Sequence, residues 1–173
     1  MATSTVEKIM AVVDSVSSKM GKLGGFLFLL LTATVLYEVL ARYIFNAPTI
    51  WSFTLTTFLW GGACLLTSAW VLMINRHVSV DLLSAKLSPR VAKILDMVMY
   101  LFLFFPFVII IFLKGIDQAA WSWKTLQREY FSPWEAPLYP IKTLIPIAVL
   151  ILLLQGINKW IRNLIFVIRG KGS

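Results

Sequence analysis

The sequence predicts an all-α membrane protein, a single membrane domain over residues 1–173 with four transmembrane helices, and three observations support this fold class. First, 59% of the residues are hydrophobic and only 14% are charged, which is more apolar than a soluble chain of this length can bury. Second, four apolar segments, at about 22–45, 51–75, 91–114 and 141–163, each have the roughly 20 residues that a helix needs to cross hydrocarbon. Third, Lys and Arg gather at the ends of these segments, as they do at membrane surfaces.

An amphipathic helix over residues 1–21 is expected before the first span. Its apolar residues recur at steps of three and four, which places them on one face of a helix: Val6, Ile9, Val13, Val16 and Met20. This pattern predicts an interfacial helix that lies on the membrane, with packing on a partner protein as the alternative. No small-residue cleavage site follows the first apolar segment, so we expect that segment to stay in the mature protein.

A second, short amphipathic helix is expected between the second and third spans, within the sequence SVDLLSAKLSPRVAKIL. Ser88 and Pro89 supply a helix cap and a first-turn proline. A new helix is therefore expected to begin at this pair and to run into the third span.

Two glycine pairs stand inside the apolar segments, Gly24-Gly25 in the first and Gly61-Gly62 in the second. Because glycine has no side chain, such positions let two helix backbones approach closely. We therefore expect these glycines to serve helix packing rather than ligand binding.

The distribution of Lys and Arg predicts the orientation of the chain. The N-terminal arm carries three such residues, the connection between the second and third spans carries four, and the C-terminal tail carries four. The remaining five lie in or beside the connections on the opposite side. Because cytoplasmic loops are enriched in Lys and Arg, both termini are predicted to be cytoplasmic. The turn near Asn46 and the outer loop over residues 115–140 are predicted to lie outside.

The charge and the metal-ligating residues exclude several function classes. A net charge of +8 would suggest nucleic acid in a soluble protein, but here the basic residues flank apolar runs, so we expect membrane lipid and no nucleic acid. The single cysteine, Cys64, permits no intrachain disulfide, and the single histidine, His77, gives neither a haem ligand pair nor a zinc site. The sequence contains no catalytic motif. We therefore expect no enzyme activity, no catalytic residue, no metal and no cofactor.

Glu38 and Arg42 are the opposite charges that lie deep enough in a span to need an explanation. They are four residues apart with the acid first, so they share a helical face and can pair. Local pairing or contact with a partner subunit is the preferred interpretation, and a titrating carboxylate at Glu38 is the alternative. His77 and Asp81 are also four apart, at the inner end of the second span, and can share a hydrogen bond if this segment is helical.

The connection between the third and fourth spans is rich in aromatic residues, with Trp134 near its centre. Its aromatic residues are Trp121, Trp123, Tyr130, Phe131, Trp134 and Tyr139. Such residues suit a belt at the level of the lipid headgroups, and the alternative is a docking platform for an external partner. The spans themselves show neither an internal repeat nor paired helix breaks, which are typical of folds that carry a solute. The spans are therefore predicted to serve as a structural scaffold rather than to carry a solute.

The chain resembles the small membrane subunit (DctQ type) of tripartite ATP-independent periplasmic (TRAP) transporters, because two short motifs occur in the same order as in that family. The sequence RYIFNAPTIW matches that family's turn between its first two spans, at Arg42, Phe45, Asn46, Pro48 and Trp51. The sequence RHVSVDLL matches the motif after the second span, at His77, Val78 and Asp81. The chain departs from many members just after the turn, where Ser52, Phe53 and Thr54 stand in place of acidic residues.

The resemblance implies a non-catalytic small permease subunit of a sodium-coupled TRAP importer of an organic acid anion, in the bacterial inner (cytoplasmic) membrane. It implies two protein partners. A large membrane subunit (DctM type) carries the substrate and sodium sites, and a periplasmic substrate-binding protein (DctP type) delivers the substrate. The small subunit is expected to brace the large one as a scaffold and to help dock the binding protein.

Within this interpretation, Arg42, Asn46 and Trp51 are expected to shape the outer hairpin and its partner contacts, while His77 and Asp81 fix the inner bend. Two other functions compete with it. One is a small proton-coupled exporter that uses Glu38 as the titrating group. The other is a membrane anchor subunit of a respiratory enzyme.

Overall fold

The computed structural model describes residues 5–74, 89–130 and 133–169 of the chain. Its elements are α1 (Thr5–Tyr43), α2 (Ser52–Met73), α4 (Pro89–Met99), the π-helix η1 (Tyr100–Phe104), α5 (Phe105–Lys124) and α6 (Tyr139–Arg169). Four helical stretches are long and apolar enough to cross a membrane: Val6–Tyr43, Ser52–Met73, Arg90–Lys124 and Tyr139–Ile168. The prediction of an all-α protein with four membrane-spanning helices is therefore confirmed.

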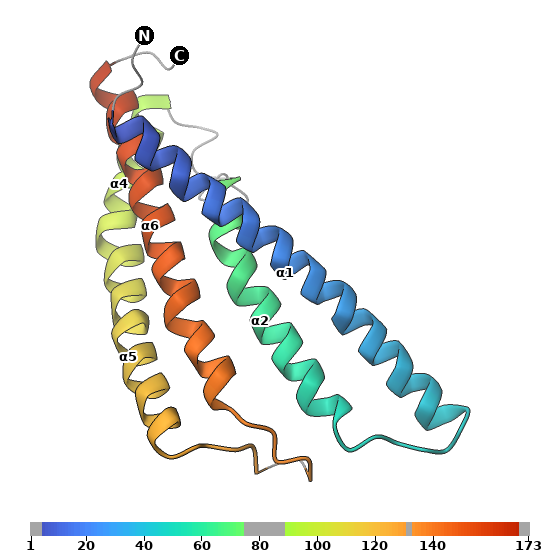
Figure 1. Ribbon diagram of the computed structural model, residues 1–173. Coiled ribbons are helices and arrows are strands. Elements are labelled where there is room, and N and C mark those ends of the chain that lie inside the picture. The colour runs from blue at the N-terminus through green and yellow to red at the C-terminus, as the bar shows by residue number, and fades with distance from the viewer. Residues whose placement is uncertain (1–4, 75–88, 131–132, 170–173) are drawn as a thin grey trace.

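The spans run up and down as two hairpins. The start of α1, the end of α6 and the start of α4 lie at one end of the bundle, while the connections 44–51 and 125–138 lie at the other (Figure 1). This arrangement places the start of the first helix and the end of the last helix at the same end of the bundle. The assignment of that end to the cytoplasm stays a prediction.

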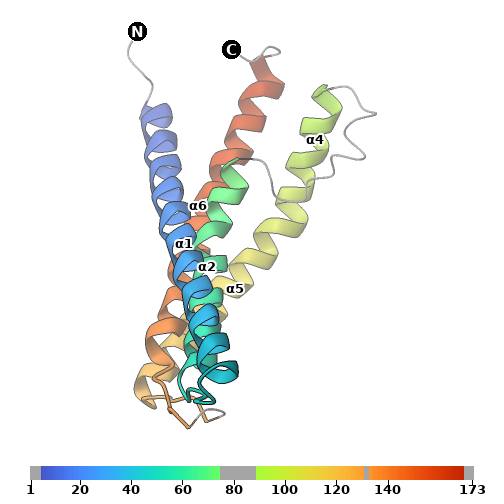
Figure 2. The same ribbon diagram turned by 90° about the vertical axis from the view of Figure 1, so that its right-hand side faces the viewer.

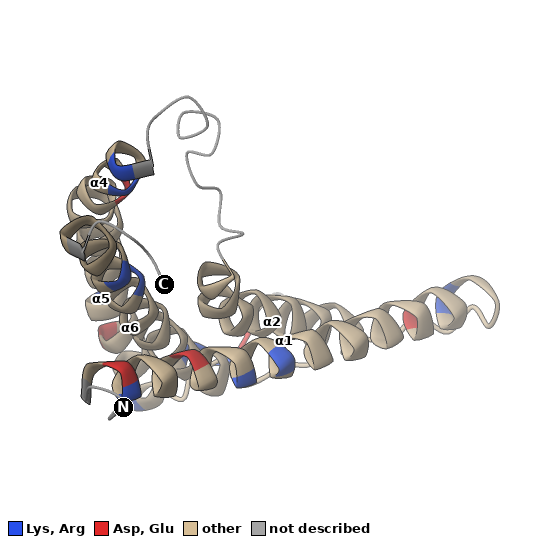
Figure 3. Ribbon diagram, turned by 90° about the horizontal axis from the view of Figure 1, so that it is seen from above, with Lys and Arg blue, Asp and Glu red and all other residues tan. Residues whose placement is uncertain are grey.

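Helix α6 is the centre of the bundle, because it contacts α1, α2, α4, α5 and η1. Helix α1 packs along α2, and α5 packs along α6. Viewed from the end that carries the termini, α1 and α2 extend to one side of α6, while α4 and α5 lie on its other side (Figure 3). The side view likewise shows α6 between the start of α1 and α4 (Figure 2).

Helix α1 is one continuous helix of 39 residues. At 1.5 Å per residue it is about 58 Å long, nearly twice the thickness of a hydrocarbon core. The predicted separate helix over residues 1–21 is not confirmed, since no break separates it from the first span. At the expected boundary α1 packs closely on α2, where a Cβ atom on Gly21 would lie 2.5 Å from the Trp70 ring.

The third span is built from three consecutive elements. The described part of this span begins with α4 at Pro89 and continues through η1 into α5, as expected for a helix that runs into the span. A separate short amphipathic helix is not confirmed, and most of the segment predicted for it lies in residues 75–88, outside the described residues. The π-helix ends just before Pro106, whose ring and missing N–H disturb a regular α-helix, so the wider turn accommodates it.

The glycine pairs divide into close and open positions. A Cβ atom on Gly24 would lie 2.6 Å from Thr67 Cγ2 and 3.0 Å from the Ala63 carbonyl oxygen, so α1 and α2 touch there. A Cβ atom on Gly62 would lie 3.4 Å from Leu27 and 3.5 Å from Leu144, in ordinary contact. At Gly25 and Gly61 a Cβ atom would meet nothing within 4 Å. Of the four glycines in these pairs, only Gly24 therefore shows the expected tight approach of two helices.

Replacing Gly24 with Ala should destabilise the fold, because the added methyl group meets a backbone carbonyl that cannot move away. Overpacking of this kind costs about 1–3 kcal/mol. Gly25→Ala is the matched control, and it should be neutral or stabilise by up to about 1 kcal/mol through helix propensity. Unfolding of the purified protein in mixed micelles, followed by tryptophan fluorescence, measures both. Equal stability of the two variants would contradict the α1–α2 contact described above.

Candidate functional site

The residues predicted as functional fall at the end of the bundle opposite the termini, or outside the described residues. Glu38, Arg42, Asn46, Pro48 and Trp51 surround the turn between α1 and α2, and Trp134 lies in the connection between α5 and α6. His77 and Asp81 lie in residues 75–88, outside the part of the chain that the structure describes. Their predicted hydrogen bond and their role stay predictions.

The Glu38 carboxylate joins the end of α1 to the turn that follows it. Its Oε1 atom accepts hydrogen bonds from Arg42 Nη2 at 2.7 Å and from Arg42 Nε at 3.2 Å. Its Oε2 atom accepts hydrogen bonds from the Thr49 hydroxyl and from the Thr49 backbone N–H, the latter at 3.3 Å. The Glu38 side chain is 14% exposed and that of Arg42 is 55% exposed. Both carboxylate oxygens are thus engaged within the hairpin, while the guanidinium group reaches the surface.

The turn itself has the local geometry that its sequence favours. Asn46 adopts a left-handed conformation with φ of 49°, which asparagine tolerates better than most residues. The Ala47 N–H donates to the Ala41 carbonyl oxygen at 3.0 Å and closes the end of α1. Trp51 stacks on Tyr37 of α1, with ring centroids 5.7 Å apart. These contacts hold the turn against the helix that precedes it.

The connection between α5 and α6 is closed on itself by backbone hydrogen bonds. Glu129 N–H donates to the Ala136 oxygen at 2.9 Å, and Leu138 N–H donates to the Gln127 oxygen at 2.9 Å. The aromatic residues divide into two groups. The Trp123 Nε1–H group donates a hydrogen bond to the Thr143 hydroxyl at 2.8 Å, and the Trp123 ring packs on the Tyr139 ring. These contacts join the end of α5 to the start of α6. Tyr130 and Trp134 are 84% and 42% exposed, so they present aromatic surface.

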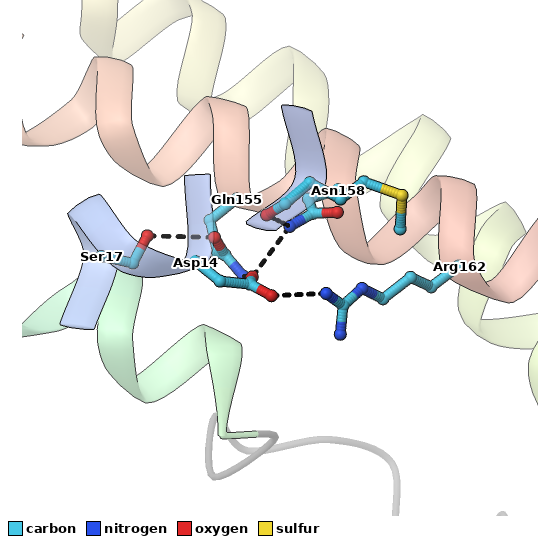
Figure 4. Close-up of polar contacts among 6 residues, drawn as sticks. Asp14, Ser17, Gln155, Asn158 and Arg162 are labelled. Carbon is cyan, nitrogen blue, oxygen red and sulfur yellow. Dashed lines mark hydrogen bonds and ion pairs between the residues drawn. The ribbon is translucent and has the colours of Figure 1, made fainter. Parts of the chain in front are cut away.

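A polar cluster at the other end of the bundle was not predicted from the sequence (Figure 4). The Asp14 carboxylate of α1 accepts hydrogen bonds from Asn158 at 2.8 Å and from Gln155 at 3.0 Å, and it pairs with Arg162. Ser17 donates to Gln155 Oε1 at 3.0 Å. We call these five residues the Asp14 cluster. It joins the first part of α1 to the second half of α6.

The cluster places buried polar side chains between helices, which was not predicted from the sequence. Ser17, Gln155 and Asn158 are 0%, 3% and 3% exposed. Nearby, Asn163 is 4% exposed and donates to the Asp96 carboxylate of α4 at 3.1 Å. Each of these four side chains makes at least one hydrogen bond to another helix, and of their buried polar atoms Asn158 Oδ1 has no partner.

A signal for this cluster is present in the sequence of α6. Gln155, Asn158 and Arg162 are spaced three and four residues apart, which places them on one face of a helix. In the sequence, Arg162 is recognisable only as one of the four basic residues of the C-terminal tail. The partner, Asp14, belongs to a segment more than 140 residues earlier, so local periodicity could not pair them.

The described residues contain no group of three or more His, Cys, Asp or Glu that could hold a metal ion. At each end of the bundle, one carboxylate collects several donors from the chain itself. Such an arrangement can fix helix ends and turns, and it can present the exposed Arg42 guanidinium to another molecule.

Comparison with known proteins gives one clear result. The model of a family described as "Tripartite ATP-independent periplasmic transporters, DctQ component" matches residues 31–165 of this chain. The match spans both hairpins and includes the turn around Glu38 and Asn46. A comparison with curated proteins found no significant match.

Replacing Asp14 with Ala should lower the free energy of unfolding by about 2 kcal/mol, because the buried Gln155 amide loses its acceptor, Arg162 loses its ion pair, and Asn158 keeps only the Met10 carbonyl oxygen as acceptor. Asp117→Ala is the control. Its pair with Lys114 spans 3.9 Å, and both side chains are more than 70% exposed, so its loss should change stability by less than about 0.5 kcal/mol. Denaturation in mixed micelles measures both variants. An Asp14→Ala protein as stable as the Asp117→Ala protein would show that the cluster does not hold α1 to α6.

Proposed function

Because this chain belongs to the DctQ family, and is thus a small permease subunit of a TRAP transporter, we propose that it acts as a non-catalytic scaffold. In this proposal it braces the large membrane subunit (DctM type), which carries the moving parts and the solute site. Family membership also implies partnership with a periplasmic substrate-binding protein (DctP type).

The observation that carries this proposal is the placement of polar side chains. Among the described residues, the two polar clusters lie at opposite ends of the bundle, around Asp14 and around Glu38, and both are internally paired. A solute or ion that crosses a membrane needs polar ligands near the midplane. The threonines Thr32, Thr34 and Thr57 donate instead to the carbonyl four residues earlier in their own helix. The buried hydroxyls of Thr54 and Ser122 have no hydrogen-bond partner, but they lie in the first turn of α2 and the last turn of α5, away from the midplane.

The apolar surface supports the bracing role. Leu29 on α1 is 68% exposed, and Phe102 and Phe107 in the third span are 70% and 65% exposed. Lipid or another membrane protein must cover side chains of this kind. The chain therefore offers wide apolar flanks to a large membrane partner.

The finer parts of the proposal concern the whole transporter. We infer that it imports an organic acid anion with sodium, that it lies in the bacterial inner membrane, and that both termini of this chain are cytoplasmic. The excess of Lys and Arg at the end with the termini supports this orientation. At the opposite end, the exposed Arg42 guanidinium and the exposed Tyr130 and Trp134 rings are suited to contact with the binding protein.

The competing functions find less support. A proton-coupled exporter would need Glu38 to bind and release protons, but its two oxygens already accept hydrogen bonds from Arg42 and Thr49. An anchor for a respiratory enzyme would need ligands for a redox group, and the chain has only one histidine.

Deleting this subunit should abolish uptake of the organic acid by cells that keep the large subunit and the binding protein. The purified binding protein should still bind the acid in a thermal-shift assay, because it does not need the membrane subunits for that step. Full uptake by the large subunit and the binding protein alone would contradict the scaffold role.

A Glu38→Gln variant separates the scaffold from the exporter. A scaffold should keep most of its uptake activity, since the amide oxygen of the substituted side chain can still accept hydrogen bonds from Arg42, and the loss of an acceptor for the Thr49 N–H affects only the stability of the turn. An exporter should lose activity outright, because glutamine does not titrate. The measurement is the uptake rate at matched amounts of assembled complex, so that any loss of assembly is counted separately.

A further inference from the structure

The first part of α1, residues 5–21, turns a polar side toward α6 and leaves an apolar side exposed. Asp14 and Ser17 face α6 in the Asp14 cluster, whereas Ile9, Val12 and Val16 are 60%, 62% and 37% exposed. We call Ile9, Val12 and Val16 the N-terminal stripe. An amphipathic helix packed on a protein in water normally buries its apolar face, because burial of that face drives the packing. The exposed stripe therefore needs another explanation.

The charges beside the stripe indicate what covers it. Lys8 and Lys19 are both exposed, and at 100° per residue Lys8 lies about 100° from Ile9 and Lys19 about 60° from Val16 around the helix. Both lysines thus lie along one edge of the stripe, next to Val12. This combination fits the boundary between acyl chains and anionic headgroups, where lysine ammonium groups meet phosphate.

The position of the segment along the bundle agrees with this boundary. Helix α1 is about twice as long as the hydrocarbon core is thick, so a large part of it must leave the membrane interior at one end. It runs obliquely to α6 (Figure 1), and its first turns lie at the end where α4 and α6 also carry Lys and Arg (Figure 3). That end of the bundle is electrostatically suited to an anionic lipid surface.

We propose that residues 5–21 bind the surface of a membrane that contains anionic phospholipid. The N-terminal stripe enters the boundary of the acyl chains, and Lys8 and Lys19 contact the phosphate groups. The Asp14 cluster holds the opposite side of the helix on α6, so the segment joins the bundle to the lipid surface. This inference concerns the chain alone and does not rest on the transport function proposed above.

Spin-label accessibility in the full-length chain tests this proposal. In a Cys64→Ser background, nitroxides are attached to Ile9→Cys, in the stripe, and to Ala11→Cys, an exposed position about 160° away around the helix. The chain is reconstituted into vesicles of mixed phosphatidylcholine and phosphatidylglycerol, and into vesicles of phosphatidylcholine alone. The ratio of oxygen accessibility to nickel-chelate accessibility reports contact with lipid against contact with water.

The ratio should be higher at position 9 than at position 11 in the mixed vesicles, and it should fall at position 9 when phosphatidylglycerol is left out. The double variant K8Q/K19Q should lower it in the same way, because each lysine contributes about fivefold to association with an anionic surface. Equal ratios at the two positions would overturn the proposal. So would protection of position 9 that arises only when the large subunit is added, since a protein would then cover the stripe.

Discussion

Polar side chains inside a membrane need partners within the protein, because hydrocarbon offers none, and this constraint explains the placement of the two carboxylates Asp14 and Glu38. The Asp14 carboxylate collects donors from α6 at one end of the bundle. The Glu38 carboxylate collects donors from its own helix and the following turn at the other end. The Asp14 cluster therefore holds the first part of α1 on α6, and the Glu38 contacts hold the turn on the end of α1.

Helix α6 holds the bundle together. It contacts every other described helix, through Pro146 and Gly115 on the side of α5 and through the polar face with Gln155 on the side of α1. Helix α2 of the α1–α2 hairpin also packs against α6, on the side away from α5, where Gly62 lies in contact with Leu144. A bundle organised in this way is braced from within and exposes apolar flanks to lipid or protein. These are the properties that a static subunit beside a moving one needs.

Sequence reasoning predicted the features that depend on local patterns. Segment length and hydropathy gave the four spans, and the Asn46 turn between α1 and α2 falls where its residue types favour a turn. Features that depend on contacts between residues far apart in the sequence were not predicted. Residues 5–21 have the periodicity of a surface helix, yet Asp14 and its α6 donors, together with the tight contact at Gly21, keep them in line with the first span. Likewise, the packing of α2 on α1 and α6 decides which glycine of each pair lies against another helix.

The central claim is that this chain holds a transporter together and does not itself carry a solute. Flux in reconstituted vesicles tests it most directly, with a radiolabelled organic acid that a thermal-shift screen of the binding protein has identified. The account predicts no flux above empty vesicles for this chain alone, and sodium-dependent flux when the large subunit and the binding protein are added. Saturable flux of the acid through vesicles that contain only this chain would contradict it.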